Sequence, residues 1–237
     1  MDLAEYTVMD KAESQMWWYR ALHARLLSAL APVQGRILDA GCGTGGFLAV
    51  LRAKRPDLAC IGVEWAEQAV LRAARKSGLP VVRGSINCLP LAPACIDAAV
   101  TADVLCHAAV DPAAALAELR RILRPGGLLV VNMPAYAWML SAHDRRVHNV
   151  LRQTAGQTAR MLRDAGFVGV RAHYWNSLLM PLMLIQRKIL AAGRTRSAVA
   201  PFPPWLDAIM LSMTELERRL PFHLPAGGSV LATAERP

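Results

Sequence analysis

The chain has 237 residues, of which 54% are hydrophobic, and a formal net charge of +9 from 27 basic and 18 acidic residues. This length allows one large domain or a domain with an extension, and the apolar content is ample for a packed core. The positive charge favours anionic partners such as phosphorylated substrates, nucleic acid or an anionic membrane face, although a merely basic surface explains it equally well.

The five cysteines (Cys42, Cys60, Cys88, Cys95 and Cys106) are odd in number and form no C-x-x-C pair. A structural zinc site needs closely paired ligands, so neither zinc nor a disulfide framework is expected. A reducing cytoplasm fits this pattern best, and the polar, acidic residues 1–15 do not resemble a signal peptide. No apolar run of the sequence reaches the ~20 residues that would span a bilayer.

The middle of the chain alternates between strand and helix patterns. Apolar strand patterns lie at 35–41, 59–65, 80–85, 95–103 and 128–134, and helix patterns lie at 46–56, 66–78 and 111–123. Gly78 is expected to end one helix, and Asp111 is expected to cap another that has Pro112 at its first position. Continuous apolar strands separated by helices indicate a parallel sheet covered on both faces, and right-handed crossovers make it doubly wound.

We therefore predict an α/β fold with a doubly wound, Rossmann-like sheet, in which all of residues 1–237 form a single domain. An N-terminal helical segment (1–32), with its helix over about residues 10–30, precedes the core formed by 33–175 and 228–237. A further helix and strand lie at 154–166 and 167–175, and 229–236 reads as the last strand, the seventh of the sheet. Residues 176–227 break the alternation and are expected to form a helical insertion.

The glycine-rich loop at 41–46 loosely fits the G-x-G-x-x-G pattern of dinucleotide sites, which is weak by itself. Its glycines let the backbone turn sharply and leave no Cβ between it and a ligand. The carboxylate of Asp39 would repel a pyrophosphate but suits a ligand with an ammonium or sulfonium group. Glu64, at the end of the second strand, can accept two ribose hydroxyl hydrogen bonds. S-adenosylmethionine has both features.

These motifs resemble class I S-adenosylmethionine-dependent methyltransferases of the broad type 11 group. The sequences ILDAGCGTG, GVEWAEQAV and RGSINCLPL are similar to the family's first three motifs, and residues 96–131 are similar to its fourth and fifth strands. The resemblance covers roughly residues 33–135 and implies S-adenosylmethionine as the cofactor and a seven-stranded class I methyltransferase sheet. It assigns cofactor contacts to Asp39, Gly41, Cys42, Gly43, Gly45, Glu64, Trp65, Ser85, Ile86, Asp103 and Tyr19.

One of these cofactor contacts departs from the family pattern. Many members have an aspartate at the position of Ser85, where it contacts the amino group of the adenine. A serine hydroxyl accepts that hydrogen bond more weakly, and the backbone amide of Ile86 can also read the ring.

Methyl transfer from a sulfonium is an in-line displacement that needs an aligned nucleophile and, for some acceptors, a proton acceptor. His107 follows the fourth strand and is either a general base or a loop histidine that shapes the pocket. His143 and Asp144, in the long stretch after the fifth strand, are the other catalytic candidates. No third ligand accompanies His143 and His148, so no metal is expected.

Aromatic side chains supply the candidates for substrate binding. Trp18, Tyr136, Trp138 and His148 are assigned to the substrate pocket. Residues 17–19 either fold over the cofactor as a lid or pack on the edge of the sheet. The insertion at 176–227, apolar first and basic afterwards, is expected to form a substrate lid, and a dimer contact and a membrane-interface segment are the alternatives.

The implied function is a methyltransferase that acts on oxygen or nitrogen of a small-molecule or lipid-like acceptor. An RNA or protein methyltransferase and a non-catalytic S-adenosylmethionine-binding partner protein are the alternatives. Nucleic acid is not expected as a partner because the basic residues are scattered and no RNA-binding module is recognisable. Peripheral membrane contact and a homodimer remain open.

Overall fold

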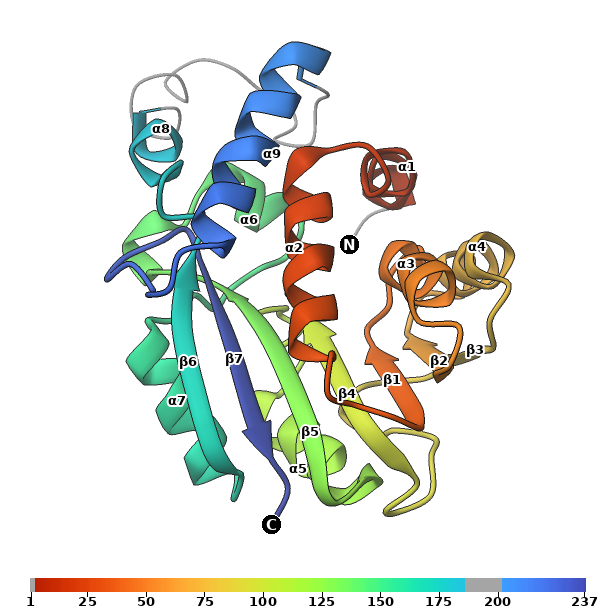
Figure 1. Ribbon diagram of the computed structural model, residues 1–237. Coiled ribbons are helices and arrows are strands. Elements are labelled where there is room, and N and C mark those ends of the chain that lie inside the picture. Colours follow the sequence, from red (N-terminus) through yellow and green to blue (C-terminus); the bar gives the residue numbers. More distant parts are fainter. Residues whose placement is uncertain (1–2, 186–201) are drawn as a thin grey trace.

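The computed structural model describes residues 3–185 and 202–237, so residues 186–201 of the predicted insertion lie outside the described part. Its strands form one sheet in the order β3-β2-β1-β4-β5-β7-β6 (Figure 1). The strands are β1 (Arg36–Ala40), β2 (Ala59–Glu64), β3 (Val81–Arg83), β4 (Ile96–Ala102), β5 (Leu123–Pro134), β6 (Val168–Trp175) and β7 (Ser229–Glu235). The helices are α1 (Leu3–Ala12), α2 (Trp17–Ala29), α3 (Gly46–Lys54), α4 (Glu67–Ser77), α5 (Pro112–Ile122), α6 (Ala142–Arg146), α7 (Ala155–Asp164), α8 (Met180–Ile185) and α9 (Pro204–Arg218), with a 3₁₀ turn η1 (Ala137–Met139).

The predicted α/β fold with seven strands is confirmed. Strands β1 to β5 pair in parallel, whereas β7 is antiparallel to both of its neighbours, β5 and β6. The last strand therefore makes the sheet mixed rather than wholly parallel, a common feature of an α/β sheet at one edge. Because β1 to β5 run in parallel, their carboxyl ends meet at one edge of the sheet, where ligands bind in open α/β folds.

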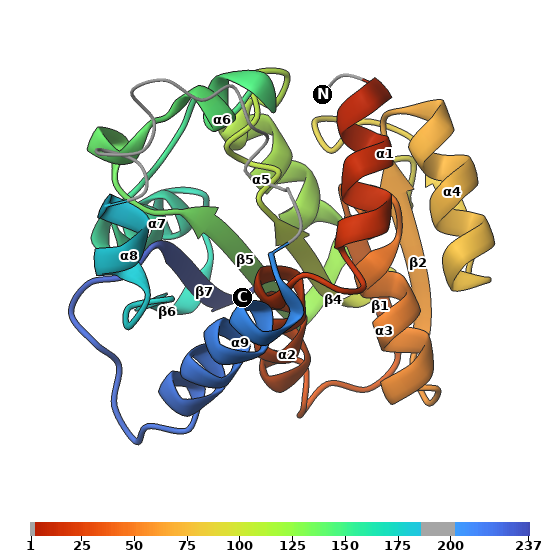
Figure 2. The ribbon, with the colours of Figure 1, turned by 90° about the horizontal axis from the view of Figure 1, so that it is seen from above.

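Helices cover both faces of the sheet (Figures 1 and 2). Each face has its own apolar core. One core packs α5 and α7 against the sheet through residues such as Leu116, Leu119 and Leu162. The other packs α2, α3 and α4 through residues such as Leu26 and Leu48. None of the described helices is long and apolar enough to cross a membrane.

Local sequence signals position several helix ends as predicted. Asp111 caps α5, since its Oδ1 accepts from the amide of Ala113 at 2.9 Å, and Gly78 follows α4 with a φ of 63°. The N-terminal segment is helical as predicted, but it is divided into two helices, α1 and α2, where one helix over about residues 10–30 was expected. The amide of Trp17, at the start of α2, donates to the carboxylate of Asp207 in α9 at 2.8 Å, a long-range cap that local patterns do not reveal.

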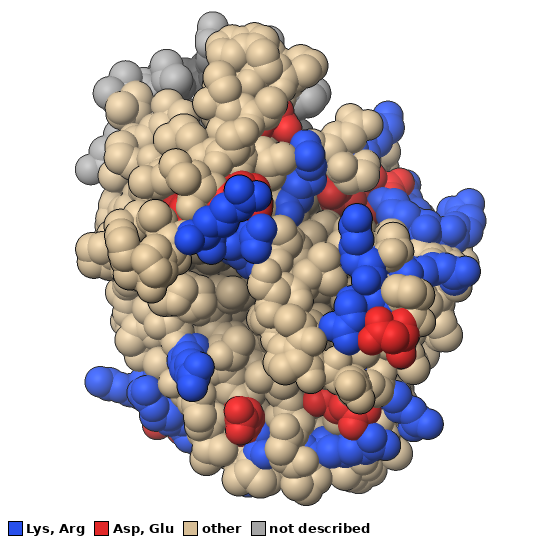
Figure 3. Space-filling view, in the orientation of Figure 1, with Lys and Arg blue, Asp and Glu red and all other residues tan. Residues whose placement is uncertain are grey.

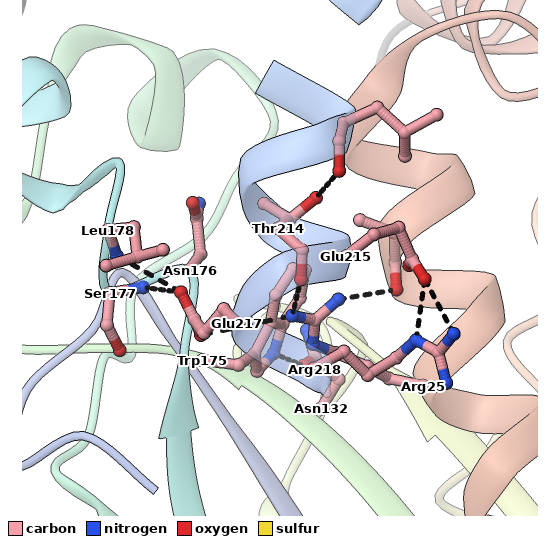
Figure 4. A network of polar contacts seen from close by, with 12 residues as sticks. Arg25, Asn132, Trp175, Asn176, Ser177, Leu178, Thr214, Glu215, Glu217 and Arg218 are labelled. Atoms are coloured by element: carbon pink, nitrogen blue, oxygen red, sulfur yellow. Dashed lines mark hydrogen bonds and ion pairs between the residues drawn. The ribbon is translucent and has the colours of Figure 1, made fainter. Parts of the chain in front are cut away.

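A buried ion pair joins the insertion to the core (Figure 4). Arg25 of α2 donates to the carbonyl of Thr214 at 2.8 Å and lies 3.9 Å from a carboxylate oxygen of Glu217, both in α9. The other oxygen of Glu217 accepts from the backbone amides of residues 177–178 at 2.7 and 3.1 Å. The guanidinium also lies 4.6 Å from the ring centroid of Trp175. These contacts fix α9 against α2 and the end of β6.

Replacement of Glu217 by alanine is expected to lower the free energy of unfolding by about 3 kcal/mol, since it leaves the guanidinium of Arg25 buried without its carboxylate. Both side chains of the pair are at most 7% exposed. Chemical denaturation measures the change. The double variant Arg25→Met/Glu217→Leu is the control, because it removes both charges, and it should be more stable than Glu217→Ala. A loss below about 1 kcal/mol in Glu217→Ala would contradict this role.

Candidate cofactor and active site

The loop between β1 and α3 turns at three glycines with positive φ, Gly41 (83°), Gly43 (54°) and Gly45 (86°). A Cβ on Gly41 would lie 2.4 Å from the side chain of Val104, and one on Gly45 would lie 2.6 Å from the Cα of Ala73 in α4. L-residues rarely adopt this backbone conformation, and here a side chain would also collide with its neighbours. The loop therefore brings bare backbone to the carboxyl edge of the sheet.

Glu64, at the end of β2, holds this loop in place. Its carboxylate is buried, and Oε2 accepts from the amide of Gly43 at 3.0 Å. Oε1 accepts from the amide of Ala66 at 3.1 Å and from the hydroxyl of Tyr6 at 3.2 Å. The side chain thus already binds a hydroxyl donor, which is the contact predicted for a ribose, and its chemistry fits the ribose of S-adenosylmethionine.

Asp39, at the end of β1, is the second acid of the site and is 4% exposed. Burial is the main reason that the pKa of its carboxyl rises to about 8, and the nearby charges of Glu13 and Glu64 contribute to the same rise. A carboxyl in this state gains its charge most readily when a cation approaches, because opposite charge favours the ionised form. The site therefore suits the positively charged amino-acid portion of S-adenosylmethionine.

Helix α1 lies across the glycine loop and contributes residues that the sequence analysis did not identify (Figure 2). Glu13, just after α1, accepts from the hydroxyl of Thr44 at 2.7 Å and forms an ion pair with Lys76 of α4. A Cβ on Gly43 would lie 2.8 Å from the methyl carbon of Met9. The N-terminal segment thus covers the glycine loop. Of the residues in these contacts, only Gly43 and Thr44 lie within the glycine motif, so local sequence patterns gave little indication of them.

The remaining predicted cofactor residues lie at the same edge of the sheet or on α2. Trp65, directly after β2, is 69% exposed, and Ile86, after β3, is buried. The hydroxyl of Ser85 accepts from the amide of Asn87 at 3.2 Å, so it shapes its own turn. Cys42 is buried in the loop, and Tyr19 packs edge-on against Trp18 within α2.

Asp103 follows β4 with a φ of 56°, unusual for a residue other than glycine. Its Oδ1 accepts from Nδ2 of Asn132 at 3.0 Å, and Oδ1 of Asn132 accepts from Nε1 of Trp175 at 2.8 Å. Burial raises the pKa of Asp103 to about 7, while the hydrogen bond from Asn132 opposes the rise. Asn132 was missed in the sequence, although a polar residue within the apolar run LLVVNMP was a usable signal.

The structure brings two predicted histidines together after β4 and β5. The rings of His107 and His148 lie 6.2 Å apart, and an isolated backbone bridge joins His107 to Asn149. Burial, and to a lesser degree the charge of His148, lower the pKa of His107. A neutral imidazole at pH 7 can accept a proton. Over residues 3–185 and 202–237, no group of three potential metal-ligating His, Cys, Asp or Glu side chains is found.

Asp144 is an anchor of the loop after β5. Its Oδ1 accepts from Nε and Nη2 of Arg152 at 3.0 and 2.7 Å, and its Oδ2 accepts from the amide and hydroxyl of Ser141 at 2.8 and 2.7 Å. These bonds overcome the effect of burial and hold its pKa below the usual range. All of its acceptor atoms are therefore engaged within the loop. His143 lies in α6, but its side chain is outside the described part of the structure.

The aromatic candidates divide between the core and the surface. Trp18 stacks on Trp175 with ring centroids 6.0 Å apart, within the core under α2. Tyr136 stacks on Tyr174 at 5.2 Å, while Trp138, 5.5 Å from Tyr136, is 58% exposed. The loop after β5 therefore presents aromatic surface beside the carboxyl edge of the sheet, whereas Trp18 serves packing.

Comparison with known proteins agrees with this geometry. Residues 38–131 match the model of a family described as a methyltransferase domain, and these residues include Asp39, the glycine loop, Glu64 and Asp103. The site and the fold together define a domain that binds S-adenosylmethionine. The matched domain resembles the class I S-adenosylmethionine-dependent methyltransferases, and S-adenosylmethionine is its cofactor.

Three relatives illustrate the range of the similarity. The chain is 38% identical over 168 residues to an uncharacterised 37.1 kDa protein in a transposon of Streptomyces fradiae. That alignment covers 62% of this chain and 48% of the other protein. The chain is 31% identical over 166 residues to trans-aconitate 2-methyltransferase of Azoarcus sp. (strain BH72), covering 68% and 63%. A probable S-adenosylmethionine-dependent methyltransferase of Mycobacterium tuberculosis is 29% identical, with 94% and 82% covered. The chain thus spans about half to two thirds of the first two relatives.

Solved structures share the fold. An S-adenosylmethionine-dependent methyltransferase of Thermotoga maritima superposes with a TM-score of 0.62 at 21% identity, covering 99% of this chain and 96% of that chain. At this identity, the likeness shows the architecture alone.

Replacement of Glu64 by alanine is expected to weaken binding of S-adenosylmethionine by roughly ten- to a hundredfold, because hydrogen bonds to charged groups are worth about 1.5–3 kcal/mol. Isothermal titration calorimetry measures the affinity. Glu67→Ala is the matched control, since it removes the same charge three residues later from a side chain that is 67% exposed. Equal affinities for the two variants would show that Glu64 is not the ribose ligand.

Replacement of Asp39 by asparagine is expected to change the pH dependence of stability. The folded-state pKa of about 8 lies above the ordinary value of 3.8 for an aspartate, so the folded wild type loses stability as pH rises through that interval. Asparagine has no proton to lose, so the difference in melting temperature between variant and wild type should grow in the variant's favour from pH 5 to pH 8. Thermal unfolding without ligand measures it, and parallel curves would refute the assignment.

Proposed function

We propose that this chain transfers a methyl group from S-adenosylmethionine to an oxygen or nitrogen atom of a small-molecule or lipid-like acceptor. The observation that carries the proposal is the carboxylate of Glu64, which holds the amide of Gly43 and accepts a hydroxyl at the carboxyl edge of the sheet. An acidic acceptor beside a bare glycine loop is the arrangement that binds the ribose of a nucleoside in α/β folds of this kind.

The chain's residues have distinct tasks in this reaction. Glu64 would hold the ribose, and the buried Asp39 would face the cationic tail. The cofactor supplies an electrophilic methyl group on its sulfonium. His107 and Asp103, which follow β4, would remove a proton from the acceptor where its chemistry requires this. Asn132 orients Asp103, and the pair of Arg152 and Asp144 holds the loop that borders the acceptor.

Several observations support a small or lipid-like acceptor. The Azoarcus relative is described as a trans-aconitate 2-methyltransferase, which acts on a small acid. Exposed apolar side chains lie on the loop after β5, where Leu140 is 45% exposed beside Trp138, and on α8, where Leu182 and Ile185 are 44% and 50% exposed. We extend the proposal to α8 and α9 as a lid over an apolar acceptor. The same side chains suit contact with a membrane surface or a second copy of the chain.

The test incubates the purified protein with methyl-labelled S-adenosylmethionine and a cell extract separated into lipid, small-molecule, RNA and protein fractions. Label is expected in the lipid or small-molecule fraction, and the Glu64→Ala variant should transfer far less. Label confined to RNA or protein would support the alternative acceptors instead. Tight cofactor binding with no transfer to any fraction would indicate a non-catalytic partner protein.

Replacement of His107 by alanine is expected to lower turnover by about 10²–10⁴-fold, the usual contribution of a general base. Cofactor affinity should stay within about twofold of the wild type, since His107 lies after β4 and not in the glycine loop. A pH–rate profile is the second measurement, because the loss of the histidine should remove its ionisation from the profile. Unchanged turnover would exclude His107 as the base and leave alignment as the source of catalysis.

A further inference from the structure

A groove of about 490 Å³ opens below the carboxyl-terminal end of α9, away from the glycine loop. It is lined by α2, β6, β7, α9 and the segment that follows α9. Figure 3 shows this face, where lysine and arginine side chains lie above and below a hollow beneath the lower end of α9. Its volume is in the range of small-molecule sites. None of the residues assigned individually to the cofactor or the acceptor lines it, and the predicted insertion contributes only residues at its end, 217–224.

The charged residues that line the groove leave it positive. They are Arg25, Arg171, Glu217 and Arg218, so three cations face one anion. Arg25 and Glu217 compensate each other, and Arg218 pairs with Glu215 at 2.6 Å. Arg171, exposed on β6, forms no ion pair within residues 3–185 and 202–237 and so leaves an uncompensated charge at the groove.

Two histidines lie face to face in the same groove. The rings of His173, on β6, and His223, after α9, are 3.7 Å apart with an interplanar angle of 14°. Burial, then the charges of His223 and Arg25, lower the pKa of His173 to about 4. Its ring is therefore neutral at pH 7, and a neutral imidazole still offers one N–H donor.

Apolar side chains form the rest of the lining. Phe222 is 57% exposed, and Leu224 and Leu231 lie on the same groove. Large exposed aromatic rings next to convergent polar donors are typical of sites that bind the apolar part of a ligand. The groove thus combines cationic and N–H donors with an apolar surface.

We propose that this groove is a second ligand site, separate from the cofactor site, for a small molecule that carries a carboxylate or phosphate group on an apolar body. Arg171 and the His173–His223 pair bind the anionic oxygens, and Phe222 with Leu224 contacts the apolar body. The geometry suits an oxyanion because Arg171 and His173 lie two residues apart on β6, and so on the same face of the sheet, and both line the groove with His223.

The test measures binding of decanoate and of decyl phosphate by isothermal titration calorimetry. Decanol and inorganic phosphate serve as probes that carry only one half of the ligand chemistry. Binding of decanoate, decyl phosphate or both, with at least tenfold weaker binding of decanol, is the expected result, and the preferred head group distinguishes carboxylate from phosphate. Decanol binding as tightly as both anions would overturn the proposal.

Variants identify the groove as the place of binding. Arg171→Ala and His223→Ala are each expected to weaken binding of the preferred anion by about tenfold, as the loss of one charge-assisted hydrogen bond does. Both side chains are exposed, and melting temperatures near that of the wild type would confirm folding. Arg160→Ala, an equal loss of charge on α7 across the sheet, is the control and should leave affinity unchanged. Equal affinities in all variants would refute the site.

A competition experiment separates the groove from the methyl-transfer site. Saturating S-adenosylhomocysteine should leave the affinity for the anion within about threefold, because the two sites share no proposed ligand. Displacement of the anion would place it in the cofactor or acceptor site and overturn the proposal. This outcome does not depend on methyl transfer, so an inactive protein with an intact groove would still bind the anion.

Discussion

The hydrogen bond from the amide of Gly43 to the carboxylate of Glu64 joins the two segments on which the cofactor site depends. It joins the loop after β1 to the end of β2, so the position of the Glu64 carboxylate relative to the glycine backbone is fixed. A charged acceptor strengthens such a bond. The loop has three glycines with positive φ. Fixing their backbone costs conformational entropy, and this hydrogen bond helps to offset that cost.

The carboxyl edge of the sheet concentrates acids that burial makes costly to ionise. Asp39, Glu13 and Asp103 all have a raised pKa, with burial as the main cause. Around Asp39, the charges of Glu13 and Glu64 add to this cost, because like charges repel in a medium that screens poorly. A cationic ligand relieves that repulsion. The local instability and the affinity for a sulfonium or ammonium group therefore have one physical origin.

Sequence reasoning placed correctly in the fold those candidate residues whose position depends on local chain geometry. Asp39, the glycine loop and Glu64 stand at strand ends, and parallel strands bring their carboxyl ends together whatever else the chain does. Asp111 and Gly78 were equally readable, since a helix cap acts within a few residues. The mixed sheet was not foreseen, because the direction of β7 depends on where the long insertion returns the chain.

The contacts that sequence reasoning missed join residues far apart in the chain. The hydroxyl of Tyr6 meets Glu64 across 58 positions, and Arg25 meets α9 across 189. The sequence pattern of neither helix predicts which residue its tyrosine or arginine contacts, since both residue types are common on helix surfaces. Arg152 with Asp144, eight residues apart, was also missed, because the loop after β5 has no regular period from which a pairing could be read.

Trp175 explains why the insertion and the catalytic edge form one structure. Its ring stacks on Trp18 and lies under the guanidinium of Arg25, while its indole N–H binds Asn132, which in turn holds Asp103. A buried indole N–H requires an acceptor, and a buried asparagine requires donors and acceptors on both sides. The contacts that run from Arg25 through Trp175 and Asn132 to Asp103 therefore satisfy the polar groups that α2 buries against the sheet.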